Sequence, residues 1–486
     1  MAGVLLVLAT RWPFTRGATI ESLEQVFASE VHIPRFEKTF FPNPGYIAEN
    51  VTFTRGEAPG VRPIASIRKI TCRASWLALI TFTHRIKRMD LVGLKIYIPA
   101  HVPPPVRKHE EPAIKTTVTD LFANGTMLEF APRHPGGQTI RFEFPELAIG
   151  NVAKDKSIHF RAKVQNPNPP GELRVSGAVG PLKMGRIGET EISGSFRLLH
   201  ADLGAYKVIA GDLSGGGRFN GTLRQAQIAG NATIPNFEVT SSRHSLGLTA
   251  EYRAVVNGTN GDVAVESAQA HFRGTTLNAH GTISGAQGKT VRLDFDSRES
   301  RIEDLLRLFV TADEAPLNGP ITLSAHVVLP PTHRPFIKRV QLDGGFSITD
   351  ADFTNPSTQE KVDELSARAR GRKDEVKTRN GPPRITEDFK GEVNLRNGIA
   401  TVRAASFVVP GAVARGGGTY DITTEGIDLR GNLAMHVSIS KAASGIKSVL
   451  LIPLDPFFKK NGESAVLPVR VSGTYSHPVF KVSLRR

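Results

Sequence analysis

The sequence predicts a mainly β protein: a long antiparallel sheet, twisted or curled, that forms an elongated groove or a sandwich, with a few short helices. Three observations predict it. Many short segments alternate apolar and polar residues, which is the period of a strand with one dry face. Turns rich in glycine and proline separate these segments, with 46 Gly and 32 Pro in 486 residues. Helical periodicity is confined to a few short stretches.

The clearest strand pattern covers residues 427–439. Its apolar side chains fall on one side: Ile427, Leu429, Leu433, Met435, Val437 and Ile439. Its polar side chains fall on the other: Asp428, Arg430, Asn432, His436 and Ser438. Successive strand side chains point to opposite faces, so this pattern predicts one long strand with a dry face and a wet face.

The first seventeen residues have a separate character. Gly3–Ala9 is apolar, and Arg11, Trp12 and Arg16 follow it. That order is typical of the exit end of a membrane helix, although the run is shorter than the roughly 20 residues that span a bilayer. A signal peptide requires a basic segment before its apolar run, and none precedes the run here. Residues 1–17 are therefore interpreted as a truncated membrane anchor or, alternatively, a short buried apolar stub.

Residues 18–164 are expected to form an N-terminal β region. Its first element is a helix over Thr19–Phe27, with Thr19 as N-cap and Ile20, Leu23 and Phe27 on one face. A Pro-rich, charged excursion follows near residues 99–113, since each proline removes a donor from a sheet. The expected strands are 31–36, 47–54, 64–72, 86–98, 114–118, 126–130, 138–144 and 158–164.

Residues 165–335 are expected to form a central β-meander, interrupted by a short helix at 300–310. Ser300 and Glu303 have the spacing of a capping box, and the apolar face of this helix holds Ile302, Leu305, Leu306 and Phe309. The strands expected in this meander include 191–198, 218–223, 233–239, 248–255, 262–265, 277–283, 291–295 and 321–329.

Residues 336–486 are expected to form a C-terminal β domain.

The net charge of +15 and the pI of about 9.9 favour contact with an anionic partner, either nucleic acid or a membrane surface. A general basic bias is the alternative. The single cysteine, Cys72, excludes an intramolecular disulfide and lies in no redox motif, so a packed side chain is expected.

Motifs for catalysis, cofactors or metals are not found in the sequence. The histidines have no metal-ligand spacing, and the Gly215–Gly217 and Gly416–Gly418 runs complete no phosphate-binding motif. Asp294 and Asp296 flank Phe295, and alternation places them on a wet strand face. Basic strand residues are mixed with acidic ones, which favours a solvated face over a nucleic-acid site. We therefore predict no enzyme activity and no cofactor.

The C-terminal region resembles a known family. Gly391–Ala400, Ser406–Ala412, Gly418–Ile422 and the long strand lead to Leu467-Pro468-Val469-Arg470-Val471-Ser472-Gly473-Thr474 and a final Pro478-Val479-Phe480. This order is similar to the end of AsmA-like proteins of Gram-negative envelopes, which are related to TamB-like and other bridge-like lipid-transfer proteins. The short apolar N-terminus, the first helix and the Phe41-Pro42-Asn43-Pro44-Gly45 turn fit the same family.

The resemblance implies a periplasmic protein anchored to the inner membrane through its N-terminal segment, which supports outer-membrane assembly. Its implied mechanism is to hold or conduct phospholipid acyl chains along an apolar β-groove. The implied partners are phospholipids or other acyl lipids, the inner membrane and outer-membrane assembly proteins, and not nucleic acid. The candidate groove residues are Ile427, Leu429, Leu433, Met435, Val437, Ile439, Val469 and Val471.

Three alternatives remain at the level of sequence. The dry face is equally the core of a structural sandwich protein that transports nothing. A glycan-active enzyme would need paired carboxylates in a cleft. A nucleic-acid binder would show salt-dependent binding to any oligonucleotide.

Overall fold

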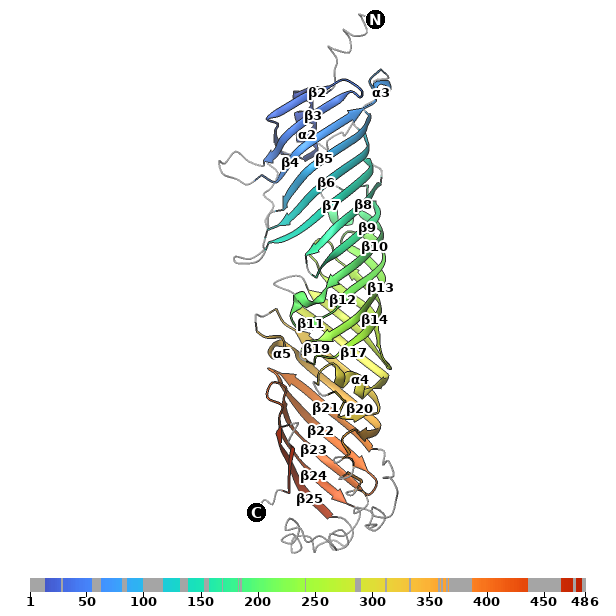
Figure 1. Ribbon diagram of the computed structural model, residues 1–486, viewed down its shortest axis with the longest axis vertical. Helices are drawn as coiled ribbons and strands as arrows, with labels where there is room; N and C mark the ends of the chain where they lie inside the picture. Colours follow the sequence, from blue (N-terminus) through green and yellow to red (C-terminus); the bar gives the residue numbers. More distant parts are fainter. Residues whose placement is uncertain are drawn as a thin grey trace, which may run out of the picture. The chain divides into compact units, whose positions relative to one another are not determined.

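The structure is a computed structural model (Figure 1). It describes residues 14–27, 29–54, 63–80, 85–98, 117–131, 139–152, 157–167, 169–181, 183, 186–240, 242–284, 290–310, 313–331, 334–356, 359, 362–363, 366, 387–435, 465–474 and 478–482. The chain divides into two compact units. Unit 1 comprises Met1–Tyr206, Asp212–Ala232 and Asn257–Thr259, and unit 2 comprises Lys207–Gly211, Thr233–Val256 and Asn260–Arg486.

The prediction of a mainly β fold with short helices is confirmed. The described strands belong to one long mixed sheet of 26 strands that is not closed into a barrel. The expectation of a purely antiparallel sheet is wrong at one place, because β5 and β6 pair in parallel, with Met89 opposite Leu121. Parallel neighbours need a long connection, and here β5 ends at Ile98 while β6 begins at Thr117. The predicted Pro-rich excursion near 99–113 lies between them, outside the described residues.

The elements that begin in unit 1 are α2 (Arg16–Phe27), β1 (Glu30–His32), β2 (Arg35–Thr39), β3 (Gly45–Thr54), β4 (Ala65–Ala74), α3 (Trp76–Ile80), β5 (Arg85–Ile98), β6 (Thr117–Phe130), β7 (Ile140–Val152), β8 (Ile158–Pro167), β9 (Pro170–Val179), η1 (Ile187–Glu189), β10 (Glu191–Asp202), η2 (Leu203–Tyr206), β12 (Asp212–Thr222) and β13 (Gln225–Val239). The boundary between the units falls within β13, after Ala232.

The elements of unit 2 are β11 (Ile209–Ala210), β14 (Ser245–Val256), β15 (Val263–Phe272), β16 (Thr275–Ser284), β17 (Thr290–Arg301), α4 (Ile302–Arg307), β18 (Leu317–Asn318), β19 (Pro320–Leu329), α5 (Phe336–Arg339), β20 (Gln341–Phe353), β21 (Glu387–Arg396), β22 (Ile399–Val409), β23 (Ala412–Asp421), β24 (Gly426–Met435), β25 (Ala465–Thr474) and β26 (Pro478–Val482). The predicted strand at 126–130 and the last two residues of the one at 114–118 belong to one strand, β6, while residues 114–116 lie outside the described residues.

The core of unit 1 lies where α2 covers the apolar face of the sheet. Ile20 and Leu23 of α2 pack on buried side chains of β3 and β4, including Val51, Phe53 and Ile70. The helix begins earlier than predicted. Thr15, not Thr19, accepts the amide of Ala18 through its side-chain oxygen (3.2 Å), while Thr19 is buried inside the helix. Cys72 is fully buried in this core, as expected, and burial raises the pKa of its thiol to about 12.

The glycine runs lie inside strands and permit close strand approach. A Cβ atom on Gly416 of β23 would lie 2.2 Å from the carbonyl oxygen of Arg430 on β24. A Cβ on Gly217 of β12 would lie 3.0 Å from the ring of Phe196, the residue opposite it on β10. Small residues at these positions leave room for the neighbouring strand or for an aromatic ring.

In unit 2, α4 packs on the apolar face of β19 and β20. Ile302, Leu305 and Leu306 contact a cluster that includes Ile321 and Ile348, as the apolar face of the predicted helix requires. The helix is shorter than predicted, and Phe309 beyond its end is 66% exposed. That prediction for Phe309 is therefore wrong.

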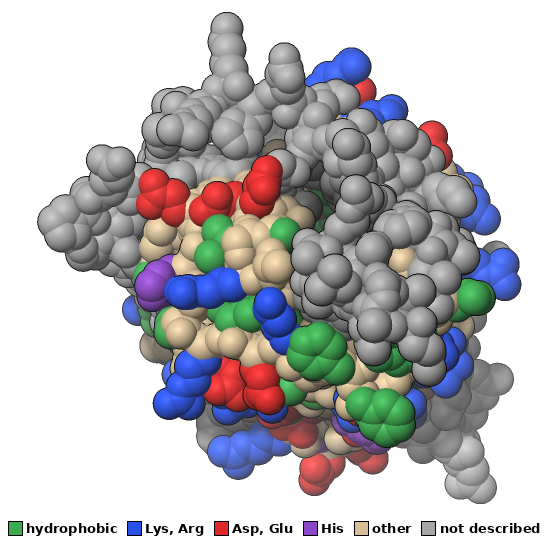
Figure 2. Space-filling view, turned by 90° about the horizontal axis from the view of Figure 1, so that it is seen from above, with side chains coloured by type: hydrophobic (Ala, Val, Ile, Leu, Met, Phe, Trp, Pro, Cys, Tyr) green, Lys and Arg blue, Asp and Glu red, His purple; other side chains and the backbone are tan. Residues whose placement is uncertain are grey.

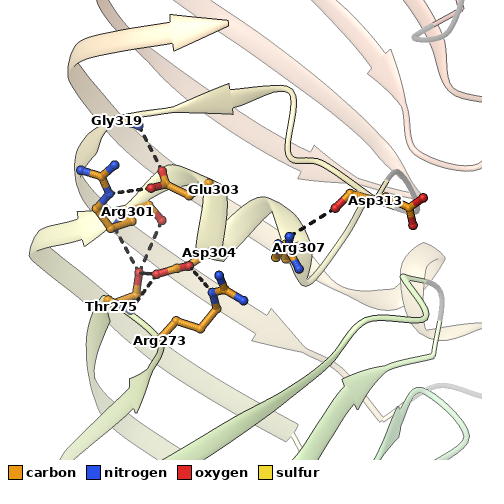
Figure 3. A network of polar contacts seen from close by, with 9 residues as sticks. Arg273, Thr275, Arg301, Glu303, Asp304, Arg307, Asp313 and Gly319 are labelled. Atoms are coloured by element: carbon orange, nitrogen blue, oxygen red, sulfur yellow. Dashed lines mark hydrogen bonds and ion pairs between the residues drawn. The ribbon is translucent and has the colours of Figure 1, made fainter. Parts of the chain in front are cut away.

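The predicted capping box is also wrong. The N-cap of α4 is Arg301, without a side-chain cap, and Ser300 instead donates to the carbonyl oxygen of Thr276 (3.0 Å). Glu303 accepts hydrogen bonds from Arg301 and from the amide of Gly319, as Figure 3 shows. Ser300 and Glu303 therefore form hydrogen bonds with residues outside the helix and do not cap its first turn.

Asp304 fastens α4 to the preceding hairpin (Figure 3). Its buried carboxylate accepts hydrogen bonds from Arg273 Nε (2.9 Å), the amide of Gly274 (2.9 Å) and Thr275 Oγ1 (3.0 Å). Its side chain is 5% exposed, whereas that of Arg273 is 50% exposed. A buried carboxylate with three donors holds the helix in a fixed place on the sheet.

Candidate functional site

The candidate groove residues of β24 and β25 lie on one face of the sheet. Directly opposite residues of an antiparallel pair share a face, and the register places Leu429 opposite Val471 and Gly431 opposite Val469. Ile427, Leu433 and Met435 lie on the same face as Leu429, because alternate residues of a strand share a face. Gly431 occupies the position of this face between Leu429 and Leu433. The structure therefore brings together six of the eight predicted residues. Val437 and Ile439 lie outside the described residues.

The same face continues on the preceding strands. On β23, Tyr420, Ala414 and Ala412 stand opposite Ile427, Leu433 and Met435. On β22, β21, β20 and β19, the register places further apolar side chains on this face. The members that the sequence analysis did not select include Phe407 and Val402 of β22, Phe389 and Val393 of β21, Phe346 and Leu342 of β20, and Leu323 and Val327 of β19. Their alternation was visible in the sequence, but the register that aligns them was not.

Aromatic rings line part of this face. The rings of Phe346 and Phe389 are 5.0 Å apart, edge to face, and those of Phe389 and Phe407 are 6.3 Å apart, also edge to face. Such pairs are a favourable arrangement of aromatic side chains. They give β20, β21 and β22 a continuous apolar surface across three neighbouring strands.

Most of these side chains are only half-buried. Leu429, Leu433, Val469 and Val471 belong to this class, whereas Met435 at the end of β24 is buried. In a sandwich, a second packed sheet would bury the middle of such a face. The described part of unit 2 therefore presents an apolar surface that its neighbouring strands and α4 cover only in part.

The opposite face of β24 and β25 is polar and internally paired. Asp428 accepts from Arg470 Nε across the strands (2.9 Å) and from Arg430 on its own strand (3.2 Å). These two hydrogen bonds, that of Arg470 first, hold the pKa of Asp428 below its ordinary value. The wet face predicted for the long strand is confirmed as far as Met435.

Asp294 and Asp296 on the polar face of β17 lie beside an imidazole and an amide group. Asp294 accepts from His326 Nδ1 (2.7 Å), and Asp296 accepts from the amide of Asn278 (3.2 Å). A hollow of about 640 Å³ on the polar face of unit 1 is lined by Arg161, Arg218, His159 and several small residues. Asp120 is the one carboxylate among its described lining residues, so the carboxylate pair of the glycan-active alternative is not found there.

Within the described ranges, no group of three His, Cys, Asp or Glu side chains converges as metal ligands. Among the same residues, none of the helices combines the length and the apolar character needed to cross a bilayer. Comparison of the chain with protein-family models and with curated proteins finds no match.

Proposed function

We propose that this chain is an AsmA-like envelope protein that holds or conducts acyl lipids along the apolar face of unit 2. The observation that supports the proposal is the register from β19 to β25. It aligns apolar side chains on one face of successive strands, and most of these side chains are half-buried.

The physical chemistry of such a face suits lipid. Each buried CH₂ group contributes about 0.8 kcal/mol, without any directional contact. A surface of Leu, Val and Phe side chains therefore stabilises an acyl chain at many positions along its length, and it does not select one headgroup. A lipid bound in this way moves between neighbouring positions at little cost, because one apolar contact replaces another.

The remainder of the proposal follows from the resemblance stated above. The protein is placed in the periplasm, attached to the inner membrane by its N-terminal segment, and it supports assembly of the outer membrane. Its partners are phospholipids or other acyl lipids and outer-membrane assembly proteins. No catalytic step or cofactor belongs to this function.

Native mass spectrometry combined with lipid extraction tests the proposal. The full-length protein, purified in mild detergent, is expected to retain phospholipid. A double variant, Leu429→Asp with Leu433→Asp, is expected to lose it while its circular dichroism remains that of a β protein. Asn432→Asp is the matched control, because it adds a carboxylate to the same strand on the exposed, polar face, and it is expected to retain lipid.

A wild-type protein that is folded and free of lipid would favour the alternative, a scaffold protein whose apolar face serves packing alone. Equal lipid content in the double variant and the control would place the lipid elsewhere on the protein.

A further inference from the structure

A second apolar surface lies in unit 1, at the turn between β2 and β3 and at the short helix α3. It holds four exposed large hydrophobic residues: Phe41 is 89% exposed, Leu77 71%, Phe40 53% and Trp76 36%. We call these four residues the aromatic tip. Exposed aromatic and leucine side chains that lie close together favour contact with an apolar phase.

The aromatic tip is built on a rigid base. Gly45 of β3 stands opposite Arg73 of β4, and the amide of Ala74 donates to the carbonyl oxygen of Pro44 (2.8 Å). The indole Nε1–H of Trp76 donates to the carbonyl oxygen of Pro42 (3.2 Å). The turn and the helix are therefore held side by side, and the exposed rings are carried by residues fixed to the buried core.

Basic side chains flank the tip. Lys38 precedes it on β2, Arg73 is the last residue but one of β4, and Lys87 lies near the start of β5; all three are exposed. Glu37 is an exposed acid on the same part of β2, while Asp90 is paired with Arg88 at 2.8 Å. Figure 2, which looks onto the end of unit 1 that carries β2 and α3, shows hydrophobic side chains at the surface, with Lys, Arg, Asp and Glu side chains around them. The charge around the tip is complementary to an anionic surface.

We propose that the aromatic tip inserts into the interface of an anionic lipid bilayer. Phenylalanine at an exposed turn and tryptophan on the neighbouring short helix, with lysine and arginine beside them, match the two layers of that interface: acyl chains below and phosphate groups above. The ring centroid of Phe14 lies 6.1 Å from that of Tyr46, the neighbour of Gly45, so the first described residue of the chain lies near the base of the tip. This contact is distinct from the apolar face of unit 2 and does not rest on the function proposed for that face.

Fluorescence of the full-length chain tests the insertion directly. The chain has two tryptophans, so Trp12→Phe leaves Trp76 as the reporter. On vesicles of phosphatidylcholine and phosphatidylglycerol, Trp76 emission is expected to shift to shorter wavelength and to be quenched by brominated acyl chains. Vesicles of phosphatidylcholine alone are expected to bind more weakly, because the basic rim then has no anionic partner.

Cosedimentation with the same vesicles measures the contribution of the tip. Phe41→Ser with Leu77→Ser is expected to weaken binding by at least about 10-fold, since each side chain of this size contributes roughly that factor when fully buried. Phe309→Ser is the matched control, because Phe309 is 66% exposed but lies in unit 2, and it is expected to bind as the wild type does.

Binding to vesicles without a shift or quenching of Trp76, together with unchanged binding of the double variant, would overturn the proposal and leave the N-terminal sequence as the membrane contact. Equal weakening by Phe309→Ser would also overturn it, since binding would then be a property of any exposed ring.

Discussion

Removing the carboxylate of Asp304 is expected to release α4 from the sheet. Asp304→Ala removes the acceptor of the Gly274 amide, and it leaves the Thr275 hydroxyl with only its longer contact to the carbonyl oxygen of Arg301 (3.4 Å). Hydrogen bonds to a charged group contribute about 1.5–3 kcal/mol each. The ion pair with Arg273 adds little, because the arginine is half-exposed and such pairs contribute about 0–1 kcal/mol. We therefore expect a loss of at least about 3 kcal/mol in the local stability of α4.

Hydrogen exchange is the suitable assay, because a protein with two compact units need not unfold in one step. A loss of about 3 kcal/mol corresponds to roughly 100-fold faster exchange for amides of Ile302–Arg307 that are protected in the wild type. Asp304→Asn, which keeps one acceptor oxygen, is expected to fall between the wild type and the alanine variant.

Asp428→Ala is the control. Like Asp304→Ala, it removes a carboxylate. Asp428 has two arginine partners and lies on the exposed face of β24, so its removal is expected to leave exchange in α4 unchanged. If Asp304→Ala left exchange in α4 within about threefold of the wild type, the hydrogen bonds of Figure 3 would not hold the helix, and packing of Ile302, Leu305 and Leu306 would have to do so.

Two further predictions concern titratable groups. Arg470→Ala is expected to raise the pKa of Asp428 toward its ordinary value, because the hydrogen bond from Arg470 is the main cause of the lowered pKa. In the wild type, the pair stabilises the fold above the unfolded pKa of about 4. This contribution is lost as the pH falls through the lower pKa of the folded state. Carbon-detected NMR titration of the Asp428 carboxyl measures this pKa, and an unchanged pKa would contradict the hydrogen bond. Cys72 is expected to resist a thiol-specific reagent at neutral pH until the protein unfolds, because the thiol is fully buried and its pKa is raised to about 12; stoichiometric labelling of the native protein would contradict that burial.

Alternation along the chain predicted the fold class and the faces of the long strand. Ile427, Leu429 and Leu433 lie on one side, and Asp428 and Arg430 lie on the other, because the two-residue period is a property of the extended backbone itself. The same reasoning located most of the strands, and it located the apolar face of α4 through Ile302, Leu305 and Leu306.

Helix ends were predicted less well than strands. At α4, the hydrogen-bond partners of the two expected capping residues come from distant parts of the chain. Ser300 and Glu303 have the spacing of a capping box, yet Thr276 and Gly319 take their hydrogen bonds. At α2, Thr15 rather than Thr19 provides the capping oxygen. At α4 the tertiary structure decides which partners Ser300 and Glu303 reach. At α2 the capping contact is local, and the error lay in the position of the helix start.

By itself, then, the sequence determined which segments are strands and which of their side chains share a face. Only the tertiary structure decided which strands are neighbours: it made β5 and β6 parallel, aligned Phe346, Phe389 and Phe407 into one surface, and left Leu429 and Leu433 half-buried. The physical reason is that the direction of a side chain follows from the torsion angles of its own residue. Strand pairing and burial depend instead on hydrogen bonds and contacts between residues far apart in the chain, which no local pattern records.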